Sequence, residues 1–119
     1  WQWLQGGRKK GEKPKQTAHR ETREEIGVRS KDLKFLGFLP RTTVYEYPEG
    51  MRPRPYRGQI HTWAVFRYRR KGIPDLRYAK TRDFSELRWE TAAWTRLHTA
   101  AFSRPVYAQV EDMLIDFLA

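Results

Sequence analysis

The pattern of apolar and polar residues predicts a helix near each end of the chain. Residues 15–26 are good helix formers without Gly or Pro, and Gly27 stands where a helix C-cap is expected. Near the C-terminus, apolar residues recur at spacings of three and four, with Pro105 where a first helical turn would lie. This spacing predicts an amphipathic helix, whose apolar residues are Val106, Tyr107, Val110, Met113, Leu114, Phe117 and Leu118.

Extended segments are predicted between these two helices. Residues 35–39 are a short apolar run that ends at Pro40, and residues 59–68 alternate between two faces, which indicates a strand. We also expect short strands at 1–5 and 87–89, and irregular loops over 45–56 and 71–85. Helices at two places around scattered strands predict an α+β fold or a mixed sandwich.

Composition narrows the class of protein. A length of 119 residues fits one domain, and an aromatic content of 14% argues against disorder. The absence of Cys excludes a disulfide scaffold, a Cys-ligated zinc site and thiol catalysis. No apolar run approaches the roughly 18 residues of a membrane span, so we expect a soluble protein without a membrane partner.

The net charge favours a polyanionic partner. Lys and Arg number 24 against 14 Asp and Glu, which gives +10 at pH 7. Cationic clusters gain free energy by releasing counterions from phosphate backbones, although the same charge also suits an ordinary solvated basic surface. The basic stretches are Arg8–Lys10, Arg52–Arg57, Arg67–Lys71 and Arg77–Arg82.

The first predicted helix carries a cluster of carboxylates. At about 100° per residue, Glu21, Glu24 and Glu25 fall on one face. Hard oxygen ligands in this arrangement suit Mg²⁺ or Mn²⁺, and Arg20, four residues before Glu24, can pair with that carboxylate. Taken alone, the segment is more typical of an ordinary solvated helix with ion pairs.

The spacing around this helix is that of a known motif. Gly6, Glu12 and the segment Arg20–Val28 resemble the Nudix box, which reads Gly, five residues, Glu, seven residues, Arg-Glu-aliphatic, any, Glu-Glu, any, Gly-aliphatic. Thr22 stands in the first aliphatic position. The chain is therefore identified as a member of the Nudix hydrolases, and the resemblance implies a loop–helix–loop metal site.

Segments outside the box resemble one subgroup, the RNA 5′-pyrophosphohydrolases and the related dinucleoside polyphosphate hydrolases. Trp1–Gly7 is similar to the Trp-Gln-aromatic-Pro-Gln-Gly-Gly run of that subgroup, with Leu4 in place of Pro. Tyr45–Pro48 resembles its Tyr-any-aliphatic-Pro loop. Asp83-Phe84, followed by Arg88-Trp89, resembles the segment that brings a further carboxylate to the metals.

The same resemblance implies residues that contact substrate. Gln59, with Trp63 four residues later, resembles the strand whose Gln faces the substrate, and Phe102 lies where the subgroup stacks a base. Arg104 is our candidate for phosphate binding, next to a Ser where the subgroup has Lys. Tyr45 completes the predicted substrate contacts. His61, on the same face as Gln59, either contacts phosphate or hydrogen-bonds within the protein, and Trp63 and Trp89 are expected in the core.

The resemblance also implies a division of roles at the metal site. Two or more Mg²⁺ (or Mn²⁺) ions would be held by Glu21, Glu24 and Glu25, together with the backbone carbonyl of Gly6. The general base would be Glu24 or Asp83. Structural roles within the motif fall to Glu12, which would order the loop, and to Arg20 and Gly27.

As a fold, the resemblance implies a Nudix α/β/α sandwich with a mixed sheet. Strands of that sheet would precede Trp1, so we expect residues 1–119 to be a single, N-terminally truncated Nudix domain. Another protein, such as a partner in a ribonucleoprotein assembly, could complete the sheet. Any targeting segment would lie outside this sequence, and we expect an intracellular protein, cytoplasmic or mitochondrial.

The functional prediction is a Mg²⁺-dependent pyrophosphohydrolase that acts on the 5′ polyphosphate end of RNA. The charge of +10 exceeds what a free nucleotide requires, which favours RNA. One alternative is a dinucleoside polyphosphate hydrolase. Another is a non-catalytic, RNA-binding Nudix subunit of a large ribonucleoprotein complex.

Overall fold

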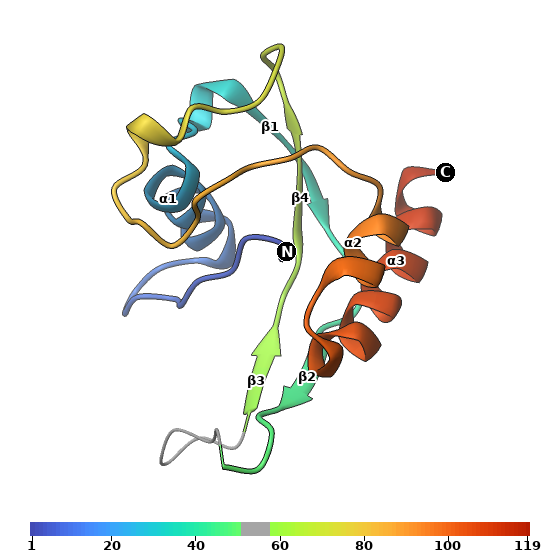
Figure 1. Cartoon of the computed structure of the whole chain (residues 1–119). Helices are drawn as coiled ribbons and strands as arrows, with labels where there is room; N and C mark the ends of the chain where they lie inside the picture. The colour runs from blue at the N-terminus through green and yellow to red at the C-terminus, as the bar shows by residue number, and fades with distance from the viewer. Residues whose placement is uncertain (51–57) are drawn as a thin grey trace. The chain divides into compact units, whose positions relative to one another are not determined.

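The structure is a computed structural model that describes residues 1–50 and 58–119 (Figure 1). Within these ranges it has three α-helices, four strands and three short 3₁₀ turns. In chain order they are α1 (Pro14–Ile26), η1 (Ser30–Asp32), β1 (Leu33–Phe38), β2 (Thr43–Glu46), β3 (Gly58–His61), β4 (Ala64–Tyr68), η2 (Leu76–Tyr78), α2 (Ala92–His98), η3 (Ala101–Ser103) and α3 (Arg104–Leu118). Helices combined with small sheets confirm the α+β prediction.

Contacts within the chain group it into two compact units. Unit 1 comprises residues 1–2, 38–63 and 90–119, and unit 2 comprises residues 3–37 and 64–89. Unit 1 therefore holds β2, β3, α2 and α3, whereas unit 2 holds α1 and β4 and all of β1 except its last residue.

Helix α1 of unit 2 has clear signals at both ends. Pro14 occupies its first turn, and the backbone N–H of Lys13 donates to Gln16 Oε1 at 2.8 Å. Gly27 ends the helix with φ 73°, and its N–H donates to the carbonyl of Arg23 at 2.9 Å. A Cβ at Gly27 would lie 2.6 Å from the carbonyl carbon of Tyr78, so glycine is required for space as well as conformation. The predicted helix and its cap are confirmed.

A two-stranded sheet supports α1 in unit 2. Strand β1 pairs with β4, and the bond from Arg69 N–H to the carbonyl of Asp32 joins the start of β1 to the end of β4, so the pair is antiparallel. Phe66 contacts Phe35 across the pair at 5.6 Å between ring centroids, and His19 of α1 packs on Phe66 at 4.8 Å. Burial lowers the pKa of His19 below its ordinary value.

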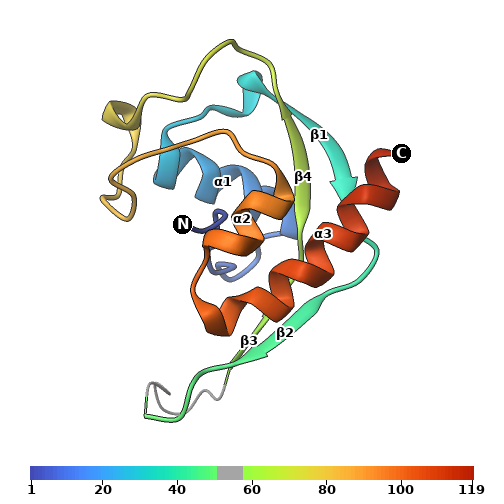
Figure 2. The same ribbon diagram turned by 45° about the vertical axis from the view of Figure 1, so that its right-hand side comes forward.

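Unit 1 combines a β ribbon with a helix pair. Strands β2 and β3 are antiparallel, in a register that runs from Thr43 opposite His61 to Glu46 opposite Gly58. Helices α2 and α3 lie side by side in both views (Figures 1 and 2), and Arg96 of α2 bonds Glu111 of α3 at 2.5 Å. The buried apolar residues of α3 follow the predicted spacing: Val106, Tyr107, Val110 and Met113.

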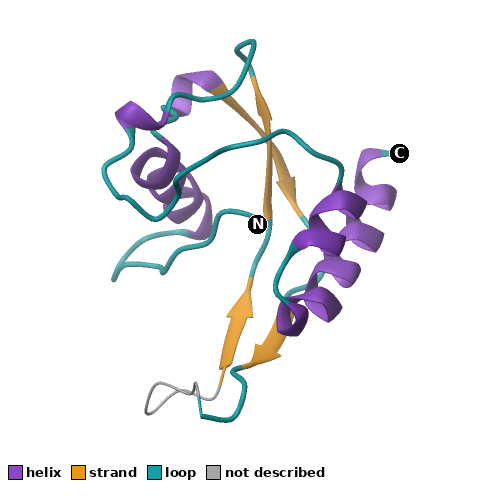
Figure 3. Ribbon diagram, viewed as in Figure 1, coloured by secondary structure: helices purple, strands orange, loops and turns teal. Residues whose placement is uncertain are grey.

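Several predicted strands differ from the structure. The run 59–68 is two strands, β3 and β4, because the chain changes pairing partner at Thr62 and Trp63. No strand forms at 1–5 or 87–89, which Figure 3 draws as loop. The predicted loop over 45–56 begins inside β2, and its residues 51–56 lie outside the described part of the chain, as does the basic stretch Arg52–Arg57.

Two further features were not predicted. Helix α2 is capped by Thr91, whose hydroxyl accepts a hydrogen bond from the N–H of Trp94 at 3.1 Å. Trp89 was expected in the core but is 59% exposed. Across the described residues, the structure contains no helix with the length and apolar character that a bilayer crossing requires.

Candidate active site

Glu25, at the end of α1, is the buried carboxylate of the site. It is 7% exposed, and its Oε2 accepts no hydrogen bond from the described residues. The pKa of Glu25 is raised to about 7, chiefly by burial. The negative charges of Glu21, Asp83 and Glu24 contribute to this rise, and a hydrogen bond from the backbone of Gln5 opposes it. Unit 2 therefore gathers four carboxylates that the sequence separates by as many as 62 residues (83 − 21).

The backbone carbonyl oxygen of Glu24 connects α1 to the segment that carries Asp83. The carbonyl of Glu24 lies within the last turn of α1, where a carbonyl has no partner inside the helix. It accepts hydrogen bonds from the N–H groups of Lys80 and Thr81, at 2.8 and 3.1 Å. These bonds hold residues 80–81 against α1 and so bring Asp83 to the carboxylate group.

Arg20 crosslinks the loop before α1 to the helix. Its Nε and Nη2 bond the two carboxylate oxygens of Glu12 at 2.7 and 2.9 Å, and Nη2 also donates to the carbonyl of Gly7 at 2.7 Å. Its Nη1 reaches Glu21 Oε1 at 2.7 Å and Glu24 Oε2 at 3.1 Å. The predicted Arg20–Glu24 pair is present, and the guanidinium neutralises repulsion among the three carboxylates that it contacts.

Glu12 has the surroundings of a loop-ordering residue. Its Oε1 accepts hydrogen bonds from the N–H of Lys9 at 2.7 Å and from the hydroxyl of Thr17 at 3.1 Å. The hydrogen bond from Arg20 is the main cause that lowers the pKa of Glu12 to about 2. The bond from Lys9 closes the loop on itself, and the bonds from Thr17 and Arg20 attach the loop to α1. These are the contacts expected of a residue that orders the loop.

Gly6 lies directly against Glu21. A Cβ built on Gly6 would lie 2.0 Å from Glu21 Cδ, so any side chain there would collide with the carboxylate. The lack of a side chain thus lets the backbone of the loop approach the acidic face of α1, where Gly6 is the predicted carbonyl ligand.

The donor types at this site fit a hard divalent cation. Glu21 and Glu24 each give one oxygen to Arg20, and their second oxygens accept no hydrogen bond from the described residues. Together with the unpartnered Oε2 of Glu25, these are the oxygen ligands that Mg²⁺ and Mn²⁺ prefer. Within residues 1–50 and 58–119, however, no three His, Asp or Glu side chains stand in a ready-made metal cluster, so the ligand set stays a prediction.

Unit 1 carries the predicted substrate residues, and Gln59 is their centre. Its Oε1 accepts a hydrogen bond from the hydroxyl of Tyr45 at 2.9 Å and lies 2.7 Å from His61 Nε2. Its Nε2 donates to the hydroxyl of Tyr47 at 2.6 Å. Sequence reasoning missed Tyr47 as a partner of Gln59, because β2 was not predicted and the Tyr45–Gln59 register could not be seen.

The aromatic rings around Gln59 extend to Phe102. The Tyr45 ring lies 5.2 Å from His61 and 6.1 Å from Phe102, and Phe102 is 43% exposed. Trp63 packs against Tyr107 at 6.3 Å, and its indole N–H donates to the hydroxyl of the buried Thr43 at 2.9 Å, which supports its predicted structural role. Arg104, the predicted phosphate contact, is exposed at the start of α3.

Comparison with known proteins places the chain in a family. The model of the NUDIX domain matches residues 1–110. A protein named RNA pyrophosphohydrolase from Dinoroseobacter shibae is 33% identical over 99% of this chain and 76% of its own length. Proteins of the same name from Rhodospirillum rubrum and Pseudoalteromonas translucida are 35% and 31% identical, over 98% and 92% of this chain and 72% and 67% of their own lengths. The chain belongs to the Nudix family, and it is a hydrolase of phosphoric anhydride bonds, as its box predicted.

Proposed function

We propose that this protein is a divalent-metal-dependent pyrophosphohydrolase that acts on the 5′ polyphosphate end of RNA. The observation that carries the proposal is the buried carboxylate of Glu25, with an unpartnered oxygen, next to three further acidic groups in unit 2. A carboxylate in this position is costly for a protein unless a cation offsets the charge. The name of the relatives and the net charge of +10 support RNA as the substrate.

Glu21, Glu24 and Glu25, with the carbonyl of Gly6, would hold Mg²⁺ or Mn²⁺. When bound, such ions neutralise polyphosphate charge and lower the pKa of water toward neutrality. The chain's own contribution is to hold the ligands in place. Arg20 fixes two of these carboxylates and the loop that carries Gly6, so the site is organised before substrate binds.

Hydrolysis also requires a group that accepts a proton from the attacking water. Glu24 and Asp83 are the two candidates, since both belong to the carboxylate group around Glu25. Attack of water on a 5′-triphosphate end would break the anhydride bond between the α- and β-phosphates, leave a 5′-monophosphate on the RNA and release pyrophosphate. Phe102 would stack the terminal base, Arg104 would contact phosphate, and Gln59 and Tyr45 would shape the surface on which the nucleotide lies.

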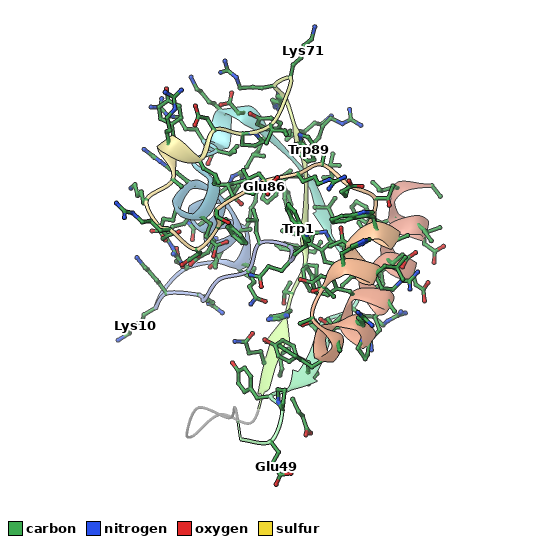
Figure 4. All side chains as sticks on the ribbon, in the orientation of Figure 1. Trp1, Lys10, Glu49, Lys71, Glu86 and Trp89 are labelled. Carbon is green, nitrogen blue, oxygen red and sulfur yellow. The ribbon has the colours of Figure 1, made fainter. Side chains whose placement is uncertain are left out.

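The catalytic half of this proposal is tested by charge-removing, shape-conserving substitutions. Glu24→Gln and Glu25→Gln are each expected to lower kcat by at least about 100-fold, because each removes a group that stabilises transition-state charge. The matched control is Glu86→Gln, an exposed glutamate of unit 2 (Figure 4), which should retain wild-type rates. Wild-type rates in both site variants would overturn the catalytic assignment.

The substrate half is tested by product analysis. The protein is incubated with Mg²⁺ and either 5′-triphosphorylated RNA or a dinucleoside tetraphosphate, and the products are separated by chromatography. RNA with a 5′-monophosphate end is the expected main product. Preferential cleavage of the dinucleotide would instead assign a dinucleoside polyphosphate hydrolase. RNA binding without turnover of either compound would favour a non-catalytic subunit of a ribonucleoprotein.

A further inference from the structure

An exposed tryptophan in unit 2 lies outside the residues assigned above. Trp89 is 59% exposed, yet its indole N–H donates to the carbonyl of Gly72 at 2.8 Å. One side of the ring packs on Tyr68, at 5.7 Å between centroids and 33° between planes. The hydrogen bond and the ring contact fix the indole while much of its surface remains open to solvent.

The bend that holds this indole is strongly basic. Arg69, Arg70 and Lys71 directly precede Gly72, and all three are exposed. Lys71 projects outward from the tip of the bend (Figure 4). Gly72 has φ 81°, a left-handed conformation that favours glycine and lets the chain turn back toward Trp89. We call Trp89 together with residues 69–72 the basic indole surface.

Local acidic groups leave most of this positive charge uncompensated. Arg70 pairs with Asp32 at 3.7 Å, but its side chain is still 63% exposed. Asp75, the next acidic residue along the loop, is bound by Arg77 at 2.7 Å. Among the described residues, the side chains of Arg69 and Lys71 have no ion-pair partner.

We infer that the basic indole surface binds the single-stranded body of an RNA whose 5′ end is processed by the same chain. Proteins hold single strands by stacking bases on aromatic rings and contacting the backbone with cations, and both components meet here. A fixed ring loses little conformational freedom when a base stacks on it. The positive charge favours a polyanion over a protein partner as the occupant.

The inference rests on the proposed function, and it adds a dependence on RNA length. Asp83 precedes Trp89 by six residues, so the two α-carbons are at most about 20 Å apart. A strand of several nucleotides can span that separation, so an RNA whose 5′ end lies at the carboxylate group can also reach the indole. A strand long enough to span the two places can use both, whereas a shorter one can use only one of them at a time.

The test compares 5′-monophosphorylated RNAs of 3 and 12 nucleotides, with binding followed by fluorescence anisotropy of a 3′ dye in EDTA. Trp89→Ala is expected to weaken binding of the 12-mer by about 5-fold or more, the effect of losing one stacked base, and to weaken binding of the 3-mer less. Trp89→Phe keeps a ring and should restore most of the affinity. Thermal melting of each variant shows that the fold is retained.

The cationic part is tested through salt dependence. The double variant Arg69→Ala/Lys71→Ala should reduce the slope of log affinity against log salt for the 12-mer by about 1.4, from about 0.7 per phosphate contact on single strands. The matched control is Arg41→Ala, at an exposed arginine of unit 1, which should leave the slope unchanged. Equal 12-mer affinities in wild type and Trp89→Ala would overturn the inference and leave the surface to a protein partner.

Failure of this inference is distinguishable from failure of the proposed function. Turnover of triphosphorylated RNA with no effect of Trp89→Ala on the 12-mer overturns the surface alone. Binding of the 12-mer that depends on Trp89, without turnover of any RNA end, supports the surface and contradicts the catalytic proposal.

Discussion

Replacement of Gln59 by Ala tests whether this residue mainly organises the ribbon of unit 1. Its amide bonds two tyrosine hydroxyls and His61. The four side chains are half-buried, so water can replace part of each lost bond. At the low end of about 0.5–1.5 kcal/mol per hydrogen bond, Gln59→Ala should lower the free energy of unfolding by about 1.5 kcal/mol.

The assay is urea unfolding of the whole chain, followed by circular dichroism, at pH 7.5. This pH keeps His61 neutral, because burial lowers the pKa of its imidazole below the ordinary value of 6.5. The midpoint should fall while the slope against urea stays constant, since the substitution does not change how much surface unfolding exposes. The control is Gln109→Ala, the same change at an exposed position of α3, with an effect within about 0.5 kcal/mol.

A second measurement separates organisation from substrate contact. If Gln59 acts through its protein partners, Tyr47→Phe removes one of the same bonds and should reproduce part of the loss in stability. A Gln59→Ala variant with unchanged urea midpoint but slower RNA hydrolysis would refute this reasoning. Gln59 would then be a substrate contact whose bonds to Tyr45, Tyr47 and His61 contribute nothing measurable.

Three further predictions follow from single side chains. Hydrogen bonds, the largest effect being that from Arg20, lower the pKa of Glu12 from 4.5 to about 2. This carboxylate therefore stabilises the fold fully above pH 4.5 and progressively less as the pH falls toward 2. Glu12→Gln should remove that part of the acid dependence in urea midpoints measured from pH 5 to pH 2.5. Met113→Ala should lower the free energy of unfolding by about 2–5 kcal/mol, because the side chain of Met113 is only 4% exposed. Ile115→Ala should lower it far less, because Ile115 is 62% exposed. In EDTA, Glu25→Gln should not lower the melting temperature, because it replaces a carboxylate that burial disfavours with a neutral group of the same shape. Added Mg²⁺ should raise the melting temperature of the wild type only, because a ligand stabilises only the protein that binds it.

Local signals made the helices predictable from sequence. Helix α1 begins at a Pro and ends at a Gly with positive φ, and α3 displays its apolar stripe in the spacing of its residues. Helix α2 has only seven residues, too few for a periodic stripe, and its one strong signal is the cap at Thr91. Whether so short a helix forms depends mainly on its packing against a neighbouring helix, which the local sequence does not reveal.

The strands show what alternation along the chain cannot encode. Residues 59–68 alternate without interruption, but β3 pairs with β2 whereas β4 pairs with β1. The partner of a strand depends on segments far away in sequence, so the break at Thr62 and Trp63 has no local signal. Trp89 likewise carries no local signal of its position, because its indole is exposed and donates a hydrogen bond to Gly72, 17 residues away.

The spacing of the motif identified the carboxylates of α1, but which of them is buried depends on which side of the helix faces the protein interior. Thr22 and Glu25 are the buried residues of this helix, and a spacing of three places them on one stripe. Arg20 and Glu24 form a neighbouring stripe, where the guanidinium can reach the acidic groups at the surface. The motif therefore puts one carboxylate on the buried side and leaves two beside Arg20. Burial of Glu25 costs stability, and a fold selected for stability alone would have an apolar residue there. The cation-binding role proposed for Glu25 would account for an acidic residue at this position, because a bound cation would offset the stability that its burial costs.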